Sequence, residues 1–187
     1  MKKEISYLFY FLLLFSITAC TSSQEKLNEQ ISEKQKELYS DSSMVPDENK
    51  AKEMIKLYVD YADKYPEDTI SATYLFKAGD LSSKMNETKQ AIDLFERMIK
   101  KYPDHNSTPY ALFLQGFIYE NQVGDPAKAK PYYEAFLKNY PDHPIARDVT
   151  FSLENLGKTP EELIREFENK LEAEGEAKND STAATSR

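Results

Sequence analysis

The dipeptide Tyr-Pro occurs three times in this chain, and its spacing limits the possible folds more than any other feature. The copies are Tyr65-Pro66, Tyr102-Pro103 and Tyr140-Pro141, so they stand 37 and 38 residues apart. A proline pushes the residue before it out of the helical conformation, and each pair is therefore expected to end a helix. A regular period of about 20–50 residues is typical of repeat proteins. We therefore expect one structural unit to recur along the chain.

An apolar stripe precedes each Tyr-Pro pair. The stripes consist of Met54, Tyr58 and Tyr61, of Ala91, Phe95 and Met98, and of Ala129, Tyr133 and Phe136. Each has the spacing i, i+4, i+7, which places its three side chains on one face of a helix. One helical hairpin is too small to bury such a face alone, so neighbouring units must stack. The pattern predicts an all-α solenoid.

The segment from Ala72 to Pro103 resembles a tetratricopeptide repeat, a helix–turn–helix unit of about 34 residues with a sparse pattern of large and small positions. The matches are Leu75, Gly79, Ala91, Phe95 and Pro103 in this copy, and Leu112, Gly116, Tyr119, Ala129, Tyr133 and Pro141 in the next. The second copy has one extra residue near Gly124. The resemblance extends over about residues 30–172. It implies an all-α, tetratricopeptide-like α-solenoid of about three to four helical hairpins.

The first 19 residues read as a targeting segment rather than as part of the fold. Lys2 and Lys3 precede a largely apolar stretch from Ile5 to Ile17, which is shorter than the roughly 20 residues of a membrane span. Thr18 and Ala19 follow the stretch and lead to Cys20, the one cysteine of the sequence, so no intrachain disulfide can form. This arrangement resembles a bacterial lipoprotein signal and implies that Cys20 carries a lipid. The alternatives are an ordinary secretory signal with an incidental cysteine, or an N-terminal membrane anchor.

The remainder of the chain divides by composition. We expect a short polar tether at residues 20–24, the repeat domain at 25–173 and a disordered polar tail at 174–187. Residues 25–39 favour a helix with Leu27, Ile31 and Leu38 on one side. This helix is either the first of a degenerate repeat or a charged stalk between the lipid and the domain.

Polar residues mark the expected helix starts. Asp47, Asn86 and Asp125 are candidate N-caps. Thr159 and Glu162 have the spacing of a capping box. The helix that follows is expected to bury one face and to serve as the terminal cap that a solenoid needs for solubility. The residues of that face are Leu163, Ile164, Phe167 and Leu171.

The chain is acidic. Its net charge is −8, and because residues 1–19 contain two Lys and one Glu, the remainder carries −9. Nucleic acids and anionic membrane surfaces require clustered Lys and Arg, so neither is an expected partner. Membrane attachment would depend on the lipid alone, at about 0.8 kcal/mol for each buried CH₂.

Motifs for catalysis are lacking. Gly157-Lys158-Thr159 resembles the end of a P-loop, but Ser152 stands where the first glycine is required and no strand precedes it. His105 and His143 follow matching Tyr-Pro-Asp turns and are expected to be solvated turn residues rather than metal ligands. We therefore expect a protein that is not an enzyme and that has neither a cofactor nor a metal site.

The resemblance implies a binding groove lined by the first helix of each hairpin. Its register places Phe76, Phe113 and Phe151 at one groove position, Thr73, Tyr110 and Asp148 at a second, and Asp80, Phe117 and Asn155 at a third. The alternative is that the phenylalanines are core residues. The helix from Tyr110 to Tyr119 is apolar nearly all round, which indicates either complete burial or a binding face. We expect binding to involve Phe76, Tyr110, Phe113, Phe117 and Phe151.

These features predict a non-catalytic, lipid-anchored scaffold that binds a protein or peptide partner, with exposed basic residues favoured by the acidic charge. The architecture is similar to that of the repeat lipoproteins of outer-membrane protein assembly and of the periplasmic repeat proteins that coordinate cell division. The expected location is the outer membrane, facing the periplasm, or alternatively the cell surface. A second hypothesis is a lipoprotein that captures a glycan or peptidoglycan, although the sequence has no Trp for stacking on sugars.

Overall fold

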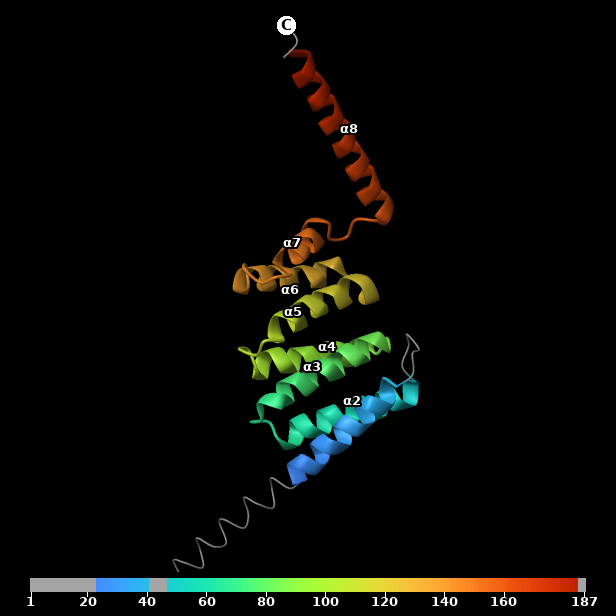
Figure 1. The fold of residues 1–187 in the computed structure, drawn as a ribbon, viewed down its shortest axis with the longest axis vertical. Helices are drawn as coiled ribbons and strands as arrows, with labels where there is room; N and C mark the ends of the chain where they lie inside the picture. Colours follow the sequence, from blue (N-terminus) through green and yellow to red (C-terminus); the bar gives the residue numbers. More distant parts are fainter. Residues whose placement is uncertain (1–22, 41–46, 185–187) are drawn as a thin grey trace, which may run out of the picture.

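The computed structural model describes residues 23–40 and 47–184, with side chains described as far as residue 172 (Figure 1). Throughout these ranges the chain forms helices and turns and contains no strand, so the predicted all-α class is confirmed. The elements are a helix over residues 23–38, α2 (Glu48–Lys64), α3 (Thr69–Lys84), α4 (Thr88–Lys101), α5 (Thr108–Ile118), the π-helical turn η1 (Tyr119–Val123), α6 (Pro126–Asn139), α7 (Ala146–Glu154) and α8 (Pro160–Ala184).

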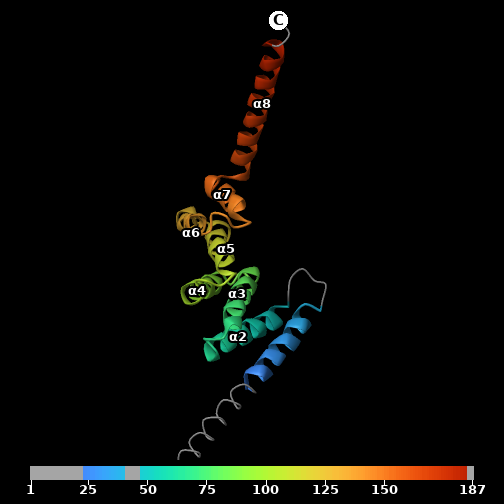
Figure 2. The same cartoon turned by 60° about the vertical axis from the view of Figure 1, so that its left-hand side comes forward.

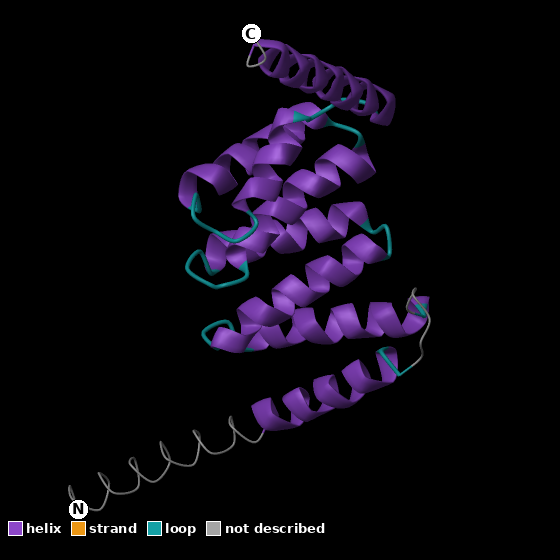
Figure 3. Ribbon diagram, turned by 45° about the horizontal axis from the view of Figure 1, so that its top comes forward, coloured by secondary structure: helices purple, strands orange, loops and turns teal. Residues whose placement is uncertain are grey.

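The helices stack in chain order. Each helix from α2 to α6 packs against the next one along the chain, and short turns join them (Figures 1 and 3). Contacts therefore run between neighbours, as in a solenoid. The predicted tetratricopeptide-like solenoid is confirmed.

The Tyr-Pro turns link each repeat to the one before it. The hydroxyl of Tyr102 donates to the carbonyl of Pro66 at 2.7 Å, and that of Tyr140 lies 3.5 Å from the carbonyl of Pro103. Tyr65 has the same place in the first turn, but no earlier Tyr-Pro turn precedes it. Its hydroxyl is buried and has no hydrogen-bond partner among the described residues. The sequence repeat thus produces a hydrogen bond between successive Tyr-Pro turns, and the tyrosine of the first turn lacks this bond.

Two glycines allow the two helices of a hairpin to approach closely. A Cβ added to Gly79 would lie 2.8 Å from the ring of Phe95, and one added to Gly116 would lie 2.5 Å from the ring of Tyr133. Both rings are fully buried. Both glycines are inside helices, so they are needed for space and not for a left-handed backbone. The small positions of the repeat pattern therefore leave room for an aromatic ring of the second helix.

The extra residue of the second repeat lies in η1. The amide of Asp125 donates to the carbonyl of Tyr119 at 2.8 Å, and Gly124 between them adopts a left-handed conformation with φ 71°. A π-helical turn is the usual way to place one additional residue in a helix. Asp125 then caps α6 by accepting from the amide of Lys128 at 3.0 Å, as predicted.

Two further predicted helix starts are confirmed. Asp47 accepts from the amide of Lys50 at 3.0 Å. Thr159 and Glu162 form the reciprocal capping box, with distances of 2.9 and 3.2 Å.

The prediction that Asn86 is an N-cap is wrong. Asn86 has a φ of 58° and ends α3, while the next residue, Glu87, stands at the N-cap of α4 without a side-chain bond. The amides of Asn86 and Glu87 donate to the carbonyls of Ser83 and Ser82, which is the Schellman pattern of a helix C-terminus. Asn is suited to both places because it tolerates the left-handed conformation as well as capping.

The helix over residues 23–38 belongs to the array, so the stalk alternative is wrong. Ile31 and Leu38 are 1% and 5% exposed and belong to the main core. At its start, Gln24 and Asn28 donate to the hydroxyl of Tyr61 at 2.9 and 3.1 Å. The expected tether at 20–24 therefore overlaps this helix at residues 23–24, and its other positions lie outside the described residues.

The last helix does not cap the solenoid as predicted. Figures 1 and 2 show α8 projecting away from the stack. The expected buried face is largely exposed: Ile164, Phe167 and Leu171 are 58%, 64% and 53% exposed. The repeat register puts Glu154 where earlier repeats have Gly79 and Gly116. A side chain at that position keeps a second helix from lying as close as α4 and α6 do.

The helix α8 continues to Ala184, where we expected a disordered tail from Glu174 onwards. From Glu174 to Ala184 the segment contains three Ala, two Glu and one Lys, which favour a helix, together with Gly175, Asn179, Asp180, Ser181 and Thr182, which do not. The polar composition on which the expected disorder is based therefore does not exclude a helix.

Candidate partner-binding groove

Three aromatic residues of α5 form a continuous strip, which we call the aromatic strip: Tyr110, Phe113 and Phe117. Tyr110 is 39% exposed, Phe117 is 42% exposed and Phe113 is half-buried. The rings of Phe113 and Phe117 lie 6.2 Å apart between centroids. The opposite side of α5 is buried, with Ala111 and Ile118 fully enclosed. An apolar helix of which one side is buried and the other carries accessible aromatic rings is suited to binding.

Phe76 and Phe113 occupy equivalent positions and make equivalent contacts. The ring of Phe76 packs on that of Phe95 at 5.8 Å, and the ring of Phe113 packs on that of Tyr133 at 6.0 Å. Both side chains are half-buried. They therefore combine the two alternatives left open by the sequence, because each ring covers the core of its repeat and keeps part of its surface accessible.

Phe151 has the same register position on α7 but different surroundings. It is 63% exposed, because α8 leaves the stack and no second-helix aromatic ring lies behind it. With Ile164, Phe167 and Leu171 it lines a shallow hollow between α7 and α8. The structure thus places Phe151 apart from the aromatic strip.

The two histidines hold equivalent turns in front of α5 and α7 through their ring nitrogens. Nδ1 of His105 accepts from the amide of Ser107 at 3.1 Å, and Nδ1 of His143 lies 3.4 Å from the amide of Ile145. Asp68 has the corresponding place in the first turn and accepts from the amide two residues on at 3.0 Å. His143 also packs edge-on against the ring of Tyr110 at 4.9 Å, which fixes one end of the aromatic strip.

A second part of the groove lies between the helix 23–38 and α3, and we call it the N-terminal cleft. It is lined by Ile31, Ser32, Gln35, Lys36, Tyr39, Ile70, Thr73, Tyr74 and Lys77. Thr73 Oγ1 lies 3.4 Å from Nε2 of His105, and His105 borders a hollow with Tyr110. The cleft and the hollow beside Tyr110 therefore adjoin at this pair of residues. Sequence reasoning missed it because the helix 23–38 lacks the repeat pattern that would have given its register.

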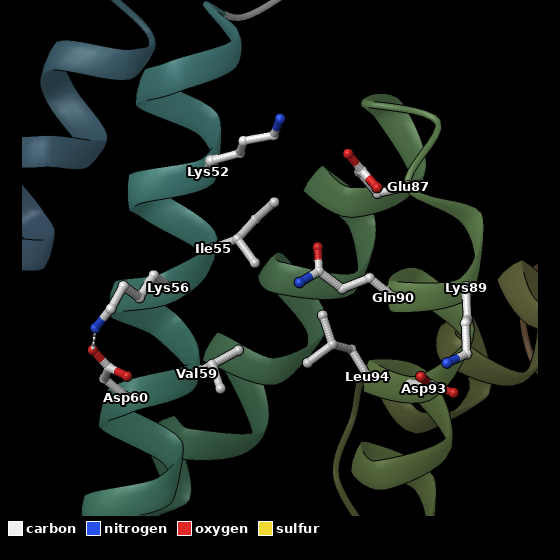
Figure 4. A pocket seen from close by; sticks show the side chains of 10 residues that line it. All are labelled: Lys52, Ile55, Lys56, Val59, Asp60, Glu87, Lys89, Gln90, Asp93 and Leu94. Atoms are coloured by element: carbon white, nitrogen blue, oxygen red, sulfur yellow. Dashed lines mark hydrogen bonds and ion pairs between the residues drawn. The ribbon is translucent and has the colours of Figure 1, made fainter.

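Another hollow lies between α2 and α4, the second helices of their hairpins (Figure 4). Its floor is formed by Ile55, Val59 and Leu94, and both signs of charge surround it. Lys56 forms an ion pair with Asp60, and Lys52 pairs with Glu48. This hollow is charge-balanced by residues of the protein itself.

The strongest electrostatic effects concern structural groups. Burial raises the pKa of the Tyr133 hydroxyl, and its 2.7 Å hydrogen bond to Glu120 raises it further. Burial works against the charged form of Asp68, but hydrogen bonds from Tyr61 and from the backbone outweigh it and hold the pKa of the carboxyl below its usual range. Both groups sit in packing contacts between helices, where their role is to hold the array together.

Within the described part of the chain, no three His, Cys, Asp or Glu side chains come together as a metal site would require. Residues 23–40 and 47–184 likewise include no helix with the length and hydropathy of a membrane span. The predicted lipid attachment site, Cys20, lies outside the described residues.

Stacked helical hairpins with a groove along their first helices define the class of protein: an α-solenoid of helical repeats. The sequence model of the tetratricopeptide repeat matches residues 73–105 and 110–143, which correspond to the hairpins α3–α4 and α5–α6. The chain is therefore a protein that contains tetratricopeptide repeats, and such repeats are generally non-catalytic scaffolds for protein–protein interaction. Comparison with curated proteins gives no match.

Proposed function

We propose that the protein is a lipid-anchored scaffold of the bacterial envelope that binds a protein or peptide partner in its groove. The observation that carries the proposal is the aromatic strip, in which Tyr110 and Phe117 are accessible although the rest of α5 is packed in the array. Aromatic anchors in a concave site are frequent carriers of binding energy, often at least about 2 kcal/mol each on truncation.

The proposed anchor is a lipid on Cys20, after removal of residues 1–19. The support is the sequence pattern described above, in which Cys20 follows a largely apolar stretch that two lysines precede. Acyl chains would hold the protein on the outer membrane, facing the periplasm, where it would serve outer-membrane protein assembly or envelope maintenance.

The proposed partner carries basic residues where it meets the aromatic strip. By the repeat register, Asp148 of α7 stands at a groove position beside α5, whereas Asp80 of α3, also at a groove position, pairs with Lys84 within the protein. Opposite charges on the partner would speed association and fix its register, and binding would weaken with salt.

The test is a photo-crosslinking amino acid placed at position 117, with position 96 as the control. Glu96 is an exposed residue of α4, a second helix, and lies outside the groove. We expect position 117 to capture a defined partner in cells and position 96 not to capture it. The purified Phe117→Ser variant should lose the partner and keep its melting temperature. Loss of stability instead would make Phe117 a core residue, and capture that is unchanged would place the binding surface elsewhere.

A further inference from the structure

We propose that the N-terminal cleft binds an acidic segment of the partner, whereas the aromatic strip meets the partner's basic residues. The inference rests on the proposed binding function and adds the chemistry of the bound segment. Lys36 on the helix 23–38 and Lys77 on α3 line the same cleft.

The cleft is basic in an acidic protein. Among its lining residues, Lys36 and Lys77 are the charged ones, and none is a carboxylate. Neither lysine belongs to an ion pair among the described residues. Nζ of Lys77 donates to the neutral Oε1 of Gln35 at 3.3 Å and lies 6.0 Å from the ring centroid of Tyr58. These two cations are therefore available to an anionic ligand.

Two other lysines of these helices are neutralised within the protein. Lys34 pairs with Glu37 and Glu53, and Lys84 at the end of α3 pairs with Asp80. The α2–α4 hollow of Figure 4 is balanced by its own carboxylates. The hollow beside Tyr110, the one between α7 and α8 and the one on α4 also each have a carboxylate among their lining residues, whereas the N-terminal cleft has two lysines and none.

The remaining cleft residues suit a polypeptide. Ile31 at the floor is 1% exposed, Tyr39 at the rim is 59% exposed, and the hydroxyls of Ser32 and Thr73 supply hydrogen-bonding groups. A carboxylate-bearing segment would gain charge-assisted hydrogen bonds from the two lysines and apolar contact with the floor. The contact between Thr73 and His105 places the cleft beside the hollow that Tyr110 lines, at one end of the aromatic strip.

The probes are two short fluorescein-labelled peptides of equal length, one in which Glu alternates with Leu and one in which Lys alternates with Leu. Their binding to the full chain is followed by fluorescence anisotropy at about 0.1 M and about 1 M salt, where the Debye length falls from about 10 Å to about 3 Å. The double variant Lys36→Glu/Lys77→Glu removes the cleft charge. The double variant Lys100→Glu/Lys138→Glu makes the same change in net charge on exposed residues of α4 and α6.

We expect the acidic peptide to bind more tightly than the basic one to the cleft, to weaken at high salt, and to lose about tenfold or more in affinity in the cleft variant. The control variant should stay within about twofold of wild type. Equal losses in both variants would mean a response to net charge only, and absent acidic-peptide binding would equally overturn the proposal. If the charge reversal unfolds the protein, Lys36→Gln/Lys77→Gln replaces it.

The two proposals fail separately. Phe117→Ser leaves the cleft intact, so acidic-peptide binding that survives in this variant supports the cleft even if the aromatic strip binds nothing. Partner capture at position 117 without acidic preference at the cleft would leave the scaffold function standing and refute the inference.

Discussion

The contact between Gly79 and Phe95 can be tested with Gly79→Ala. The sign of its effect on the free energy of unfolding depends on whether the ring of Phe95 packs against Gly79. In a helix interior, Gly→Ala is normally stabilising by about 1 kcal/mol because alanine has the higher helix propensity. At Gly79 the new Cβ would lie 2.8, 2.9 and 3.0 Å from three atoms of the Phe95 ring, which is fully buried. Such overpacking costs roughly 1–3 kcal/mol. Gly79→Ala should therefore lower the free energy of unfolding by up to about 2 kcal/mol.

The sign should reverse when the ring is removed. Phe95→Ala alone should cost roughly 3–5 kcal/mol, as for other buried aromatic truncations. In that background the Cβ of Gly79→Ala meets empty space, so the propensity gain of about 1 kcal/mol remains and the cavity is partly filled. The coupling between the two substitutions then equals the overpacking term, roughly 1–3 kcal/mol.

Urea unfolding followed by far-UV circular dichroism measures the four free energies, provided that the slope m is unchanged among the variants. Phe151→Ala is the matched control, since Phe151 is 63% exposed and its truncation should change stability by less than about 0.5 kcal/mol. If Gly79→Ala stabilises both backgrounds equally, the ring of Phe95 does not pack on Gly79 and the repeat register is wrong.

Four further predictions follow from individual contacts. Tyr102→Phe should cost about 0.5–1.5 kcal/mol by loss of the bond to the preceding turn, whereas Tyr65→Phe should be neutral or stabilising because its hydroxyl has no partner among the described residues; thermal melts compare the two. His105→Ala should cost about 0.5–1.5 kcal/mol by loss of the hydrogen bond from the amide of Ser107, and His105→Asp less, since Asp68 accepts the corresponding bond in the first turn; urea unfolding measures both. Because the pKa of Asp68 is lower in the folded state than the unfolded value of about 4, its stabilisation is complete above that value and is lost as the pH falls below it, and Asp68→Asn should flatten this part of the stability–pH curve. Cys20→Ser should release the protein from the membrane fraction or leave it unprocessed, and a variant that is still cleaved after residue 19 and still membrane-bound would refute lipid attachment there.

The packing inside the repeats could be predicted from the sequence because the repeat pattern indicates which helices contact each other as well as where the helices lie. A glycine opposite an aromatic residue specifies a close contact, and Gly116 with Tyr133 forms it as Gly79 does with Phe95. The extra residue near Gly124 could be located from the change in spacing, and the structure accommodates it as a π-helical turn.

The end of the array could not be predicted in the same way. An amphipathic stripe shows that α8 has an apolar face, but it does not show which surface that face meets. By the repeat register, Glu154 replaces the glycine of the earlier repeats, and a larger side chain there disfavours the close approach that α4 and α6 make. At the groove, spacing placed Tyr110 and Phe117 on one face, yet only the structure shows that Phe76 and Phe113 are backed by core rings and that Phe151 is not.

The first hairpin explains why the N-terminal cleft differs from the spaces between later first helices. Tyr65 has no preceding Tyr-Pro turn to bond to. The helix 23–38 is therefore not attached by a hydrogen bond of the kind that Tyr102 and Tyr140 make to the turns before them. A polar network centred on Tyr61 holds it instead. Because its position does not depend on the repeat pattern, its exposed residues are free to differ from those of α5. The aromatic strip occupies positions of the repeat pattern, whereas Lys36 lies on a helix outside that pattern. The sequence of the helix 23–38 can therefore place a basic cleft next to the aromatic strip of an acidic protein.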